Sequence, residues 1–369
     1  WWLDRGVDGF RMDVINLISK DPALPDGIVY PGRAWGEGYP HFSEGPHLHD
    51  YLAEMRREVF AGRAGTMTVG ECPGVRRDNV LLFTDPARRE LDMVFQFDHV
   101  DLGLEAGKFH PRPLRPGELA DCLSAWQEAQ GEVGWNSLYL DNHDQPRAVS
   151  RFGDEKYRYE SATALATALH MLRGTPYVYQ GEELGMTNGV FHGLDDFRDV
   201  EALRYYREAV ATGESPEAVL AGMRATGRDN ARTPVQWDAS EHAGFTEGDP
   251  WIGVTPNYRE INAASQVGDP SSVYAYYRAL ADARHGLPVI ASGMFERIAT
   301  PSPAVFAYRR TLGEAVATVF VNLSSRPASL GEAARGMVGE LLLSNRDLPE
   351  ADRGVPAVLE PWEARVYLA

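Results

Sequence analysis

The sequence contains very little cysteine. Only Cys72 and Cys122 occur among its 369 residues. Two thiols exclude a disulfide framework and a zinc site built from four thiolates. We expect both to be free and buried, and a single bridge between them is the alternative.

The sequence also lacks a basic run and a long apolar run. It has 36 Lys and Arg against 53 Asp and Glu, for a net charge of −17. Nucleic-acid binding without sequence preference needs a basic surface, and a membrane span needs about 18 uninterrupted apolar residues. With 44% apolar and 24% charged residues the composition is that of a soluble globular protein. We therefore expect neither a nucleic-acid nor a membrane partner.

The start of the chain has no initiator methionine and no signal-peptide pattern. It opens with Trp1-Trp2-Leu3-Asp4-Arg5-Gly6, which looks like an internal start. Any targeting signal upstream would be missing with the residues that carry it. At roughly 150 residues per domain, the length predicts two domains.

Short β-type runs alternate with helix-type runs over about the first 290 residues, which is typical of a parallel α/β sheet or barrel. The expected strands are 8–14, 67–70, 93–97, 137–140 and 176–179. Apolar residues at helical spacing over 48–59 and 162–172 predict two amphipathic helices that pack on the core.

The remainder of the chain has a different pattern. Residues 195–268 are loop-like, with helices expected at 199–212 and 215–224, and a last barrel-type helix follows near 273–284. Short β-type runs then occur at 305–309, 315–323, 339–343 and 364–368. We expect a barrel domain over 1–290 and an antiparallel β-sandwich over 291–369.

Polar or ionisable residues follow every expected strand of the first domain. They are Asp13, Glu71, Gln96 with Asp98, Asp141 with His143 and Asp144, and Gln180 with Glu182. In a (β/α)8 barrel the active site is assembled at the C-terminal ends of the strands, so this pattern predicts one. A doubly wound sheet would need a glycine-rich phosphate turn, and neither G-x-G-x-x-G nor a P-loop is present.

Three carboxylates are the candidates for chemistry. Arg11 and Asp13 stand two apart on one expected strand, so their side chains point to the same side. A neighbouring cation keeps a carboxylate ionised, which suits a nucleophile. Glu71 ends an apolar strand, a setting that can raise its pKa and let it donate a proton. Asp144, which follows the expected strand 137–140, is the third candidate carboxylate.

Carboxylates that converge repel one another, and such an arrangement persists where it binds a metal or performs acid/base chemistry. Asp141, His143 and Asp144 could supply a few ligands, but no H-x-x-x-H or comparable pair accompanies them, so we expect no metal. A salt bridge to arginine is the structural alternative for each carboxylate alone. Glycoside hydrolysis needs two carboxylates, one as nucleophile and one as acid/base.

The chain also resembles a known family, glycoside hydrolase family 13, the α-amylase superfamily. Residues 7–16 (VDGFRMDVIN) look like its second conserved region, 67–71 (MTVGE) like its third and 142–147 (NHDQPR) like its fourth. Residues 227–238 (GRDNARTPVQWD) are similar to the long loop of oligo-1,6-glucosidases and related α-glucosidases, and 179–185 (YQGEELG) extend the match.

The resemblance implies roles for the three carboxylates. Asp13 would be the nucleophile, Glu71 the general acid/base, and Asp144 the group that binds sugar hydroxyls and stabilises the oxocarbenium-like transition state. These roles agree with those inferred from the residues themselves.

The resemblance also implies a substrate-binding set. Arg11, His143 and Arg232 would hold the glucose, with Arg228 as the alternative to Arg232. A pair between Arg232 and Asp229 is the structural alternative for Arg232. Val14 would crowd the aglycone subsite, and in relatives a valine there accompanies α-1,6 preference. Some of four aromatic side chains would stack on sugar rings, although most of them are expected to serve core or loop packing: Trp35, Tyr39, Phe97 and Trp237.

The resemblance begins at the fourth strand of the family barrel. It implies an α/β chain with the C-terminal five βα units of a (β/α)8 TIM barrel, followed by the all-β antiparallel domain. The first expected strand should then lack a neighbour on one side, and the chain alone should be inactive. We expect no cofactor, and a calcium site, if any, would lie in the N-terminal part that is missing here.

The implied function is that of a retaining exo-acting α-glucosidase. It would hydrolyse terminal α-1,6-linked glucose from a small oligosaccharide by double displacement, in the cytoplasm. The alternatives are an α-1,4-glucosidase, a sucrose-cleaving α-glucosidase, a trehalose-6-phosphate hydrolase, a non-catalytic relative and an inactive fragment.

Overall fold

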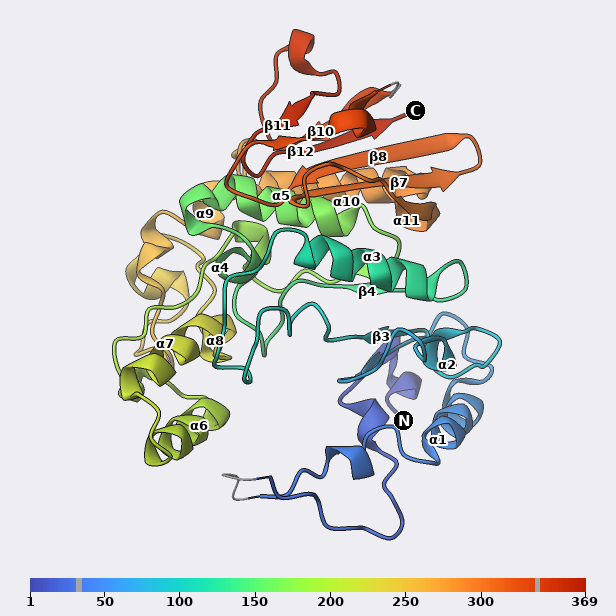
Figure 1. Ribbon diagram of the computed structural model, residues 1–369, viewed down its shortest axis with the longest axis vertical. Helices are drawn as coiled ribbons and strands as arrows, with labels where there is room; N and C mark the ends of the chain where they lie inside the picture. Colours follow the sequence, from blue (N-terminus) through green and yellow to red (C-terminus); the bar gives the residue numbers. More distant parts are fainter. Residues whose placement is uncertain (31–34, 336–338) are drawn as a thin grey trace. The chain divides into compact units, whose positions relative to one another are not determined.

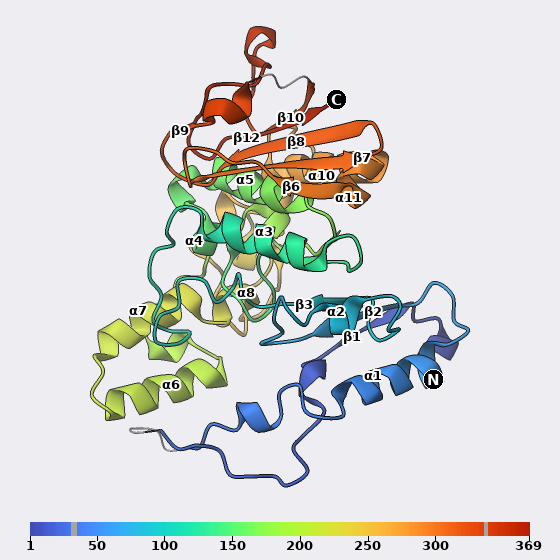
Figure 2. The same ribbon diagram turned by 45° about the vertical axis from the view of Figure 1, so that its right-hand side comes forward.

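The first three strands form a parallel sheet in the order β1 (Gly9–Met12), β2 (Met67–Glu71) and β3 (Met93–Phe95) in the computed structural model (Figure 1, Figure 2). Arg11 lies opposite Val69 in the register, so β1 and β2 end at the same edge of the sheet. Within the described part of the chain β1 pairs with β2 alone, as the sequence predicts. This edge is where Asp13 and Glu71 meet.

The structure describes residues 1–30, 35–335 and 339–369. They form two compact units. The first unit comprises Trp1–His99 and Cys122–Leu138, and the second comprises Val100–Asp121 and Tyr139–Ala369. No helix in these ranges is long and apolar enough to span a bilayer.

The helix that packs beside β1 to β3 departs from the expected stripe. Leu48 and Leu52 of α1 (Leu48–Met55) are buried in the core of the first unit, as predicted. A π-helical turn, Arg56–Phe60, then follows and changes the helical period. It turns Phe60 inward and leaves Val59 exposed, and Tyr51 within α1 is exposed as well. The prediction of one apolar face over 48–59 is therefore wrong at Tyr51 and Val59.

The short strand β4 (Ser137–Leu138) completes the first unit, and Asn136 forms a parallel bridge to Val94 of β3. Both cysteines belong to this unit and are free, as predicted. Cys72 is buried, whereas Cys122 is only half-buried.

The second unit contains most of the helices. Helix α2 (Leu81–Thr84) belongs to the first unit, and α3 (Glu118–Gln130) begins in the second unit and continues in the first. The other elements of the barrel part lie in the second unit and are α4 (Ala148–Phe152), α5 (Arg158–His170), β5 (Thr175–Pro176), α6 (Val200–Ala211), α7 (Pro216–Thr226), α8 (Asp229–Arg232), α9 (Ala263–Gln266), α10 (Val273–Gly286) and α11 (Pro288–Ser292). The fifth strand is shorter than expected because the chain turns at Tyr179, whose carbonyl accepts the N–H of Glu182.

Caps explain where these helices start. The Asp199 side chain accepts hydrogen bonds from two N–H groups in the first turn of α6, and the Ser272 hydroxyl accepts one from Ala275 N–H in α10. Pro216 at the first position of α7 loses no helical hydrogen bond. Helix α5 is buried on nearly every side from Ser161 onward rather than on one stripe, so it is not amphipathic.

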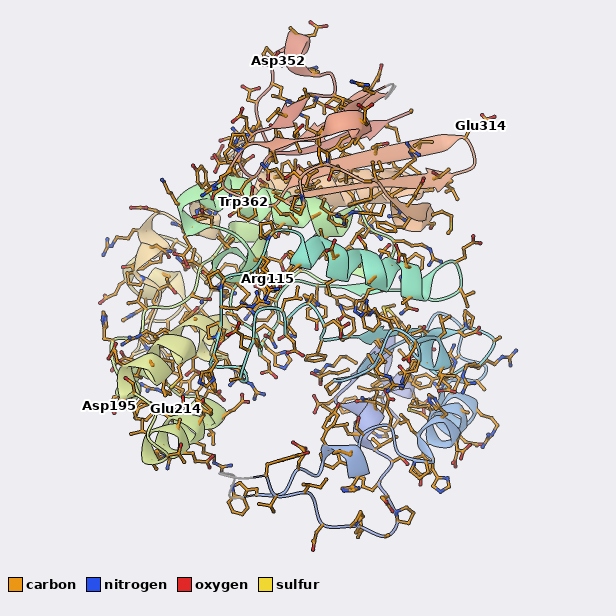
Figure 3. The ribbon with its side chains drawn as sticks, viewed as in Figure 1. Arg115, Asp195, Glu214, Glu314, Asp352 and Trp362 are labelled. Atoms are coloured by element: carbon orange, nitrogen blue, oxygen red, sulfur yellow. The ribbon has the colours of Figure 1, made fainter. Side chains whose placement is uncertain are left out.

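The C-terminal region is an antiparallel sheet of five strands in the order β10-β12-β8-β7-β6. They are β6 (Met294–Arg297), β7 (Val305–Leu312), β8 (Ala315–Asn322), β10 (Glu340–Ser344) and β12 (Ala364–Leu368). Figure 3 shows Glu314 at the tip of the β7–β8 hairpin. Gly313 has a φ of 61° there, which suits the first position of a two-residue turn.

Both faces of this sheet are covered. A small sheet of β9 (Ala328–Ser329) and β11 (Val358–Leu359) contributes to the core on one face. Helices α5 and α11 lie against the other face, and α10 packs against both of them (Figure 2). There Tyr308 donates to Ala168 O at 3.0 Å, and the buried Arg310 donates to Ile290 O at 2.8 Å. The all-β C-terminal region is as predicted, and a domain boundary between residues 290 and 291 stays a prediction.

Candidate active site

Arg11 joins two carboxylates in the first unit. Its Nη1 donates to Asp13 Oδ1 at 2.5 Å, and its Nη2 lies 2.7 Å from Glu71 Oε2. The adjacent ends of β1 and β2 bring the three side chains together, because parallel strands end at one edge. The structure therefore unites the predicted nucleophile, acid/base and one predicted substrate-binding residue.

The two carboxylates have different surroundings. The Asp13 side chain is 76% exposed, whereas that of Glu71 is 11% exposed. Burial raises the pKa of Glu71 above its ordinary value, and the neighbouring Asp13 acts in the same direction. The Val14 N–H and the Arg11 cation oppose this rise by stabilising the ionised form.

Val14 contributes through its backbone. Its N–H donates to Glu71 Oε2 at 3.2 Å from a left-handed conformation with a φ of 37° and a ψ of 44°. Positive φ is a genuine outlier for a β-branched residue. Such strain persists only where the surrounding structure enforces it, and it concentrates at functional sites.

The residues around Glu71 leave little freedom. A Cβ on Gly70 would lie 2.7 Å from side-chain atoms of Ile15 and Leu91, so only glycine fits before Glu71. On the other side, Pro73 O accepts hydrogen bonds from Asn16 Nδ2 at 2.7 Å and from Tyr39 Oη at 2.5 Å. Tyr39 thus has the packing role that we expected for most of the aromatic residues.

Asp144 is the centre of a cluster in the second unit. Its Oδ1 accepts from Arg232 Nη2 at 2.8 Å, and its N–H donates to Asn142 Oδ1 at 2.8 Å. His143 lies beside it, with Nε2 3.7 Å from Asp144 Oδ2, and the His143 carbonyl accepts from Arg232 Nε. Three predicted site residues are therefore in contact.

The alternative pairing of Arg232 with Asp229 is not what the structure shows. Asp229 Oδ2 accepts instead from the backbone N–H groups of Arg198 and Asp199. Arg228, the predicted substitute for Arg232, is a second neighbour, with Nε 3.6 Å from Asp144 Oδ1.

The sequence reasoning missed the residues that hold these arginines. Glu201 Oε2 lies 3.2 Å from Arg228 Nε and 3.0 Å from Lys108 Nζ. The fully buried Arg147 donates to Gln180 O at 2.6 Å, to Asn230 O at 3.2 Å and to Ala231 O at 3.2 Å. Arg147 belongs to the NHDQPR motif, which was a signal for it, whereas nothing local singles out Glu201.

Several polar residues at strand ends do not join either cluster. Gln96 and Asp98 bond locally, since Asp98 N–H donates to Gln96 Oε1 and Trp126 Nε1–H donates to Asp98 Oδ2. Asp141 and Glu182 are buried, with 2% and 4% exposure. The expectation that every strand-end residue faces an active site is therefore wrong for these four.

A metal centre has no candidate in the described ranges, where no three His, Cys, Asp or Glu side chains group as ligands. Among the aromatic residues predicted to stack on sugars, Trp35 and Trp237 are exposed, and Phe97 is half-buried.

Comparison with known proteins identifies the family. The profile of the family described as "Alpha amylase, catalytic domain" matches residues 1–293. An oligo-1,6-glucosidase from Parageobacillus thermoglucosidasius is 50% identical over 372 residues, which cover 100% of this chain and 66% of that protein. The chain thus spans about two thirds of the length of its relatives.

Solved structures give the same result. The crystal structure of trehalose-6-phosphate hydrolase from Bacillus licheniformis has 40% sequence identity and a TM-score of 0.89, with 100% of this chain and 66% of that chain covered. Isomaltulose synthase from Erwinia rhapontici, solved with sucrose, has 38% identity and a TM-score of 0.91, again with 100% of this chain and 66% of that chain covered. The chain belongs to the α-amylase catalytic-domain family, glycoside hydrolase family 13.

Proposed function

We propose that the full-length protein is a retaining, exo-acting α-glucosidase that releases terminal glucose, with preference for α-1,6 linkages in isomalto-oligosaccharides. The observation that carries this proposal is the Arg11 fork, which holds an exposed and a buried carboxylate side by side. A nucleophile and an acid/base with unequal environments are what double displacement requires.

In the first step, Asp13 attacks the anomeric carbon while the glycosidic C–O bond breaks. Glu71 donates its proton to the departing oxygen, and a covalent glucosyl-Asp13 ester forms. In the second step Glu71 removes a proton from water, the water oxygen attacks the anomeric carbon, and Asp13 departs. Two inversions at one carbon retain the α configuration.

Burial of Glu71 supports its role as the acid, because a raised pKa keeps the carboxyl protonated at higher pH. Arg11 supports Asp13 as the nucleophile, because the guanidinium stabilises the ionised carboxylate. Asp144, His143 and Arg232 form the sugar-binding part of the proposal, and no cofactor takes part. A cytoplasmic location stays a prediction.

The preference for α-1,6 linkages is supported by the relatives. Oligo-1,6-glucosidases are 50% and 46% identical to this chain, and a glucan 1,6-alpha-glucosidase from Streptococcus pneumoniae is 41% identical. A trehalose-6-phosphate hydrolase from Bacillus subtilis is 41% identical as well. Phosphate recognition would require a basic pocket in addition to the residues named above.

To test this proposal, the full-length wild type and Glu71→Gln are assayed for hydrolysis of four substrates: isomaltose, maltose, sucrose and trehalose-6-phosphate. We expect the highest kcat/KM for isomaltose and a loss of at least ~100-fold in the variant. A higher kcat/KM for trehalose-6-phosphate would replace the proposed substrate. No hydrolysis of any of the four would favour the non-catalytic alternative.

A further inference from the structure

Asp141 and Glu182 form a buried carboxyl pair behind the Asp144 cluster. They are 2% and 4% exposed, and their carboxyl groups lie close enough to interact. Two ionised carboxylates have only acceptors, so a hydrogen bond between them requires one proton. The proposed reaction does not use either group.

The other contacts of the pair show where the proton belongs. Asp141 Oδ2 accepts the Ala148 N–H at 2.9 Å, and Asp141 Oδ1 is buried without an N–H or hydroxyl donor in the ranges that the structure covers. Glu182 Oε1 accepts from Tyr277 Oη at 2.8 Å. Glu182 Oε2 accepts a long hydrogen bond from Tyr179 N–H at 3.4 Å. A proton on Glu182 supplies the donor that Asp141 Oδ1 lacks.

The charges around the pair agree with a single proton. Arg147 is the cation that faces Asp141, and Glu183 adds a negative charge on the same side. The Tyr277 hydroxyl faces Glu182, and burial raises the pKa of that hydroxyl. Tyr179 contacts Glu182 through its backbone N–H. His170 packs edge-on against Tyr277, and burial lowers its pKa to about 4, so it adds no charge at neutral pH. Glu183 already opposes Arg147 here, so a second ionised carboxylate in the pair would add a negative charge without a matching cation.

There is little room for water beside the pair. The cavity next to Glu182 and Tyr277 has a volume of about 10 Å³, which is the lower limit for one water molecule. A second charge in the pair would therefore have little solvent to stabilise it.

The pair connects two loops of the candidate site. Asp141 precedes Asn142, His143 and Asp144, and its bond to Ala148 N–H closes that loop at the start of α4. Glu182 belongs to the next strand-end loop, whose Gln180 carbonyl binds Arg147.

We propose that Asp141 and Glu182 share one proton, carried by Glu182, and that this hydrogen bond positions His143 and Asp144 for substrate. They are positioning residues, because they act through the loop rather than on the sugar. The shared proton stands independently of the proposed function, whereas its kinetic consequence rests on it.

The proton is tested by urea unfolding of the full-length protein between about pH 5 and pH 8. Folding raises the pKa of Glu182, so the wild type loses stability as the pH rises from the ordinary glutamate range toward the folded value. Glu182→Gln keeps a neutral donor and cannot ionise. The unfolding constant of the wild type should therefore rise about tenfold per pH unit relative to that of Glu182→Gln.

The exposed Glu208 on α6 offers a matched control, since Glu208→Gln removes the same charge from the surface. The unfolding constant of Glu208→Gln should change with pH in parallel with that of the wild type. In infrared difference spectra at neutral pH, a protonated-carboxyl band should be present in the wild type and absent in Glu182→Gln. Parallel unfolding curves for wild type and Glu182→Gln, without such a band, would overturn the shared proton.

Kinetics of isomaltose hydrolysis test the positioning role. Glu182→Leu removes the donor and should lower kcat/KM by about 10- to 100-fold, whereas Glu182→Gln should rescue it to within about threefold. Equal kcat/KM in Glu182→Leu and wild type would overturn positioning. If the wild type hydrolyses none of the glucosides, the proposed function fails, and the unfolding curves still decide the shared proton.

Discussion

The backbone N–H of Val14 donates to the carboxylate of Glu71 at 3.2 Å, one residue beyond Asp13. Through this bond the segment that carries the proposed nucleophile also stabilises the ionised form of the proposed acid/base. Burial of Glu71 favours the protonated form. Because the proposed reaction uses both forms in turn, opposed influences of this kind suit an acid/base.

The pH dependence should respond to Arg11. Glu71 must be protonated for the first step, so kcat/KM of the full-length enzyme should fall as pH rises through its raised pKa. Arg11→Gln removes a cation that favours the ionised form. The alkaline limb of the kcat/KM profile should therefore move to higher pH, and kcat should fall because Asp13 loses its partner. Arg57→Gln, a substitution at an exposed arginine, is the control and should leave the alkaline limb in place. An alkaline limb that moves to lower pH in Arg11→Gln would contradict the assignment of this limb to Glu71.

The nucleophile should be identified by Asp13→Asn. An amide is neutral and far less nucleophilic, so turnover should fall by ~10⁴-fold or more in the full-length enzyme. Proton NMR of the wild-type reaction should show α-glucose as the first product, because double displacement retains the α configuration. Retaining enzymes of this kind place the two carboxyls ~5 to 5.5 Å apart. Asp26→Asn, at an exposed carboxyl, is the control. Release of β-glucose would rule out double displacement.

Linkage preference should depend on the Val14 side chain. Val14→Ala removes two methyl groups from the wall proposed for the aglycone subsite, a change worth about 1 to 3 kcal/mol in a pocket. The ratio of kcat/KM for maltose to that for isomaltose should rise. Val29→Ala, a substitution at an exposed valine, serves as the control. An unchanged ratio in Val14→Ala would assign the preference to other residues.

Stability should depend on Arg147. Arg147→Met removes the guanidinium that donates to the carbonyls of Gln180, Asn230 and Ala231, and it removes the buried cation that faces Asp141. The free energy of unfolding should fall by about 3 to 5 kcal/mol, measured by urea denaturation. At the surface of α6, Arg207→Met should change it by about 0.5 kcal/mol or less. A loss below about 1 kcal/mol in Arg147→Met would show that the loops hold without this side chain.

The sequence by itself determined the fold class and the main candidates. Alternation of β-type and helix-type runs predicted the parallel strands, and the β-rich end predicted the antiparallel sheet, because strand periodicity and turn residues are local properties. Arg11, Asp13 and Glu71 could be foreseen as neighbours, since adjacent parallel strands must end at one edge. The pairing of His143, Asp144 and Arg232 came from motifs and not from spacing.

Only the tertiary structure decided which polar residues are buried and what they bind. Asp141 and Glu182 follow strands just as Asp13 and Glu71 do, yet the first pair is enclosed by Ala148, Tyr277 and Arg147. Glu201 meets Arg228 although α7 and a turn separate them in sequence. The left-handed backbone of Val14 was unforeseen because a valine does not favour positive φ by itself. Burial and strain depend on contacts between distant segments, and local sequence preferences do not encode them.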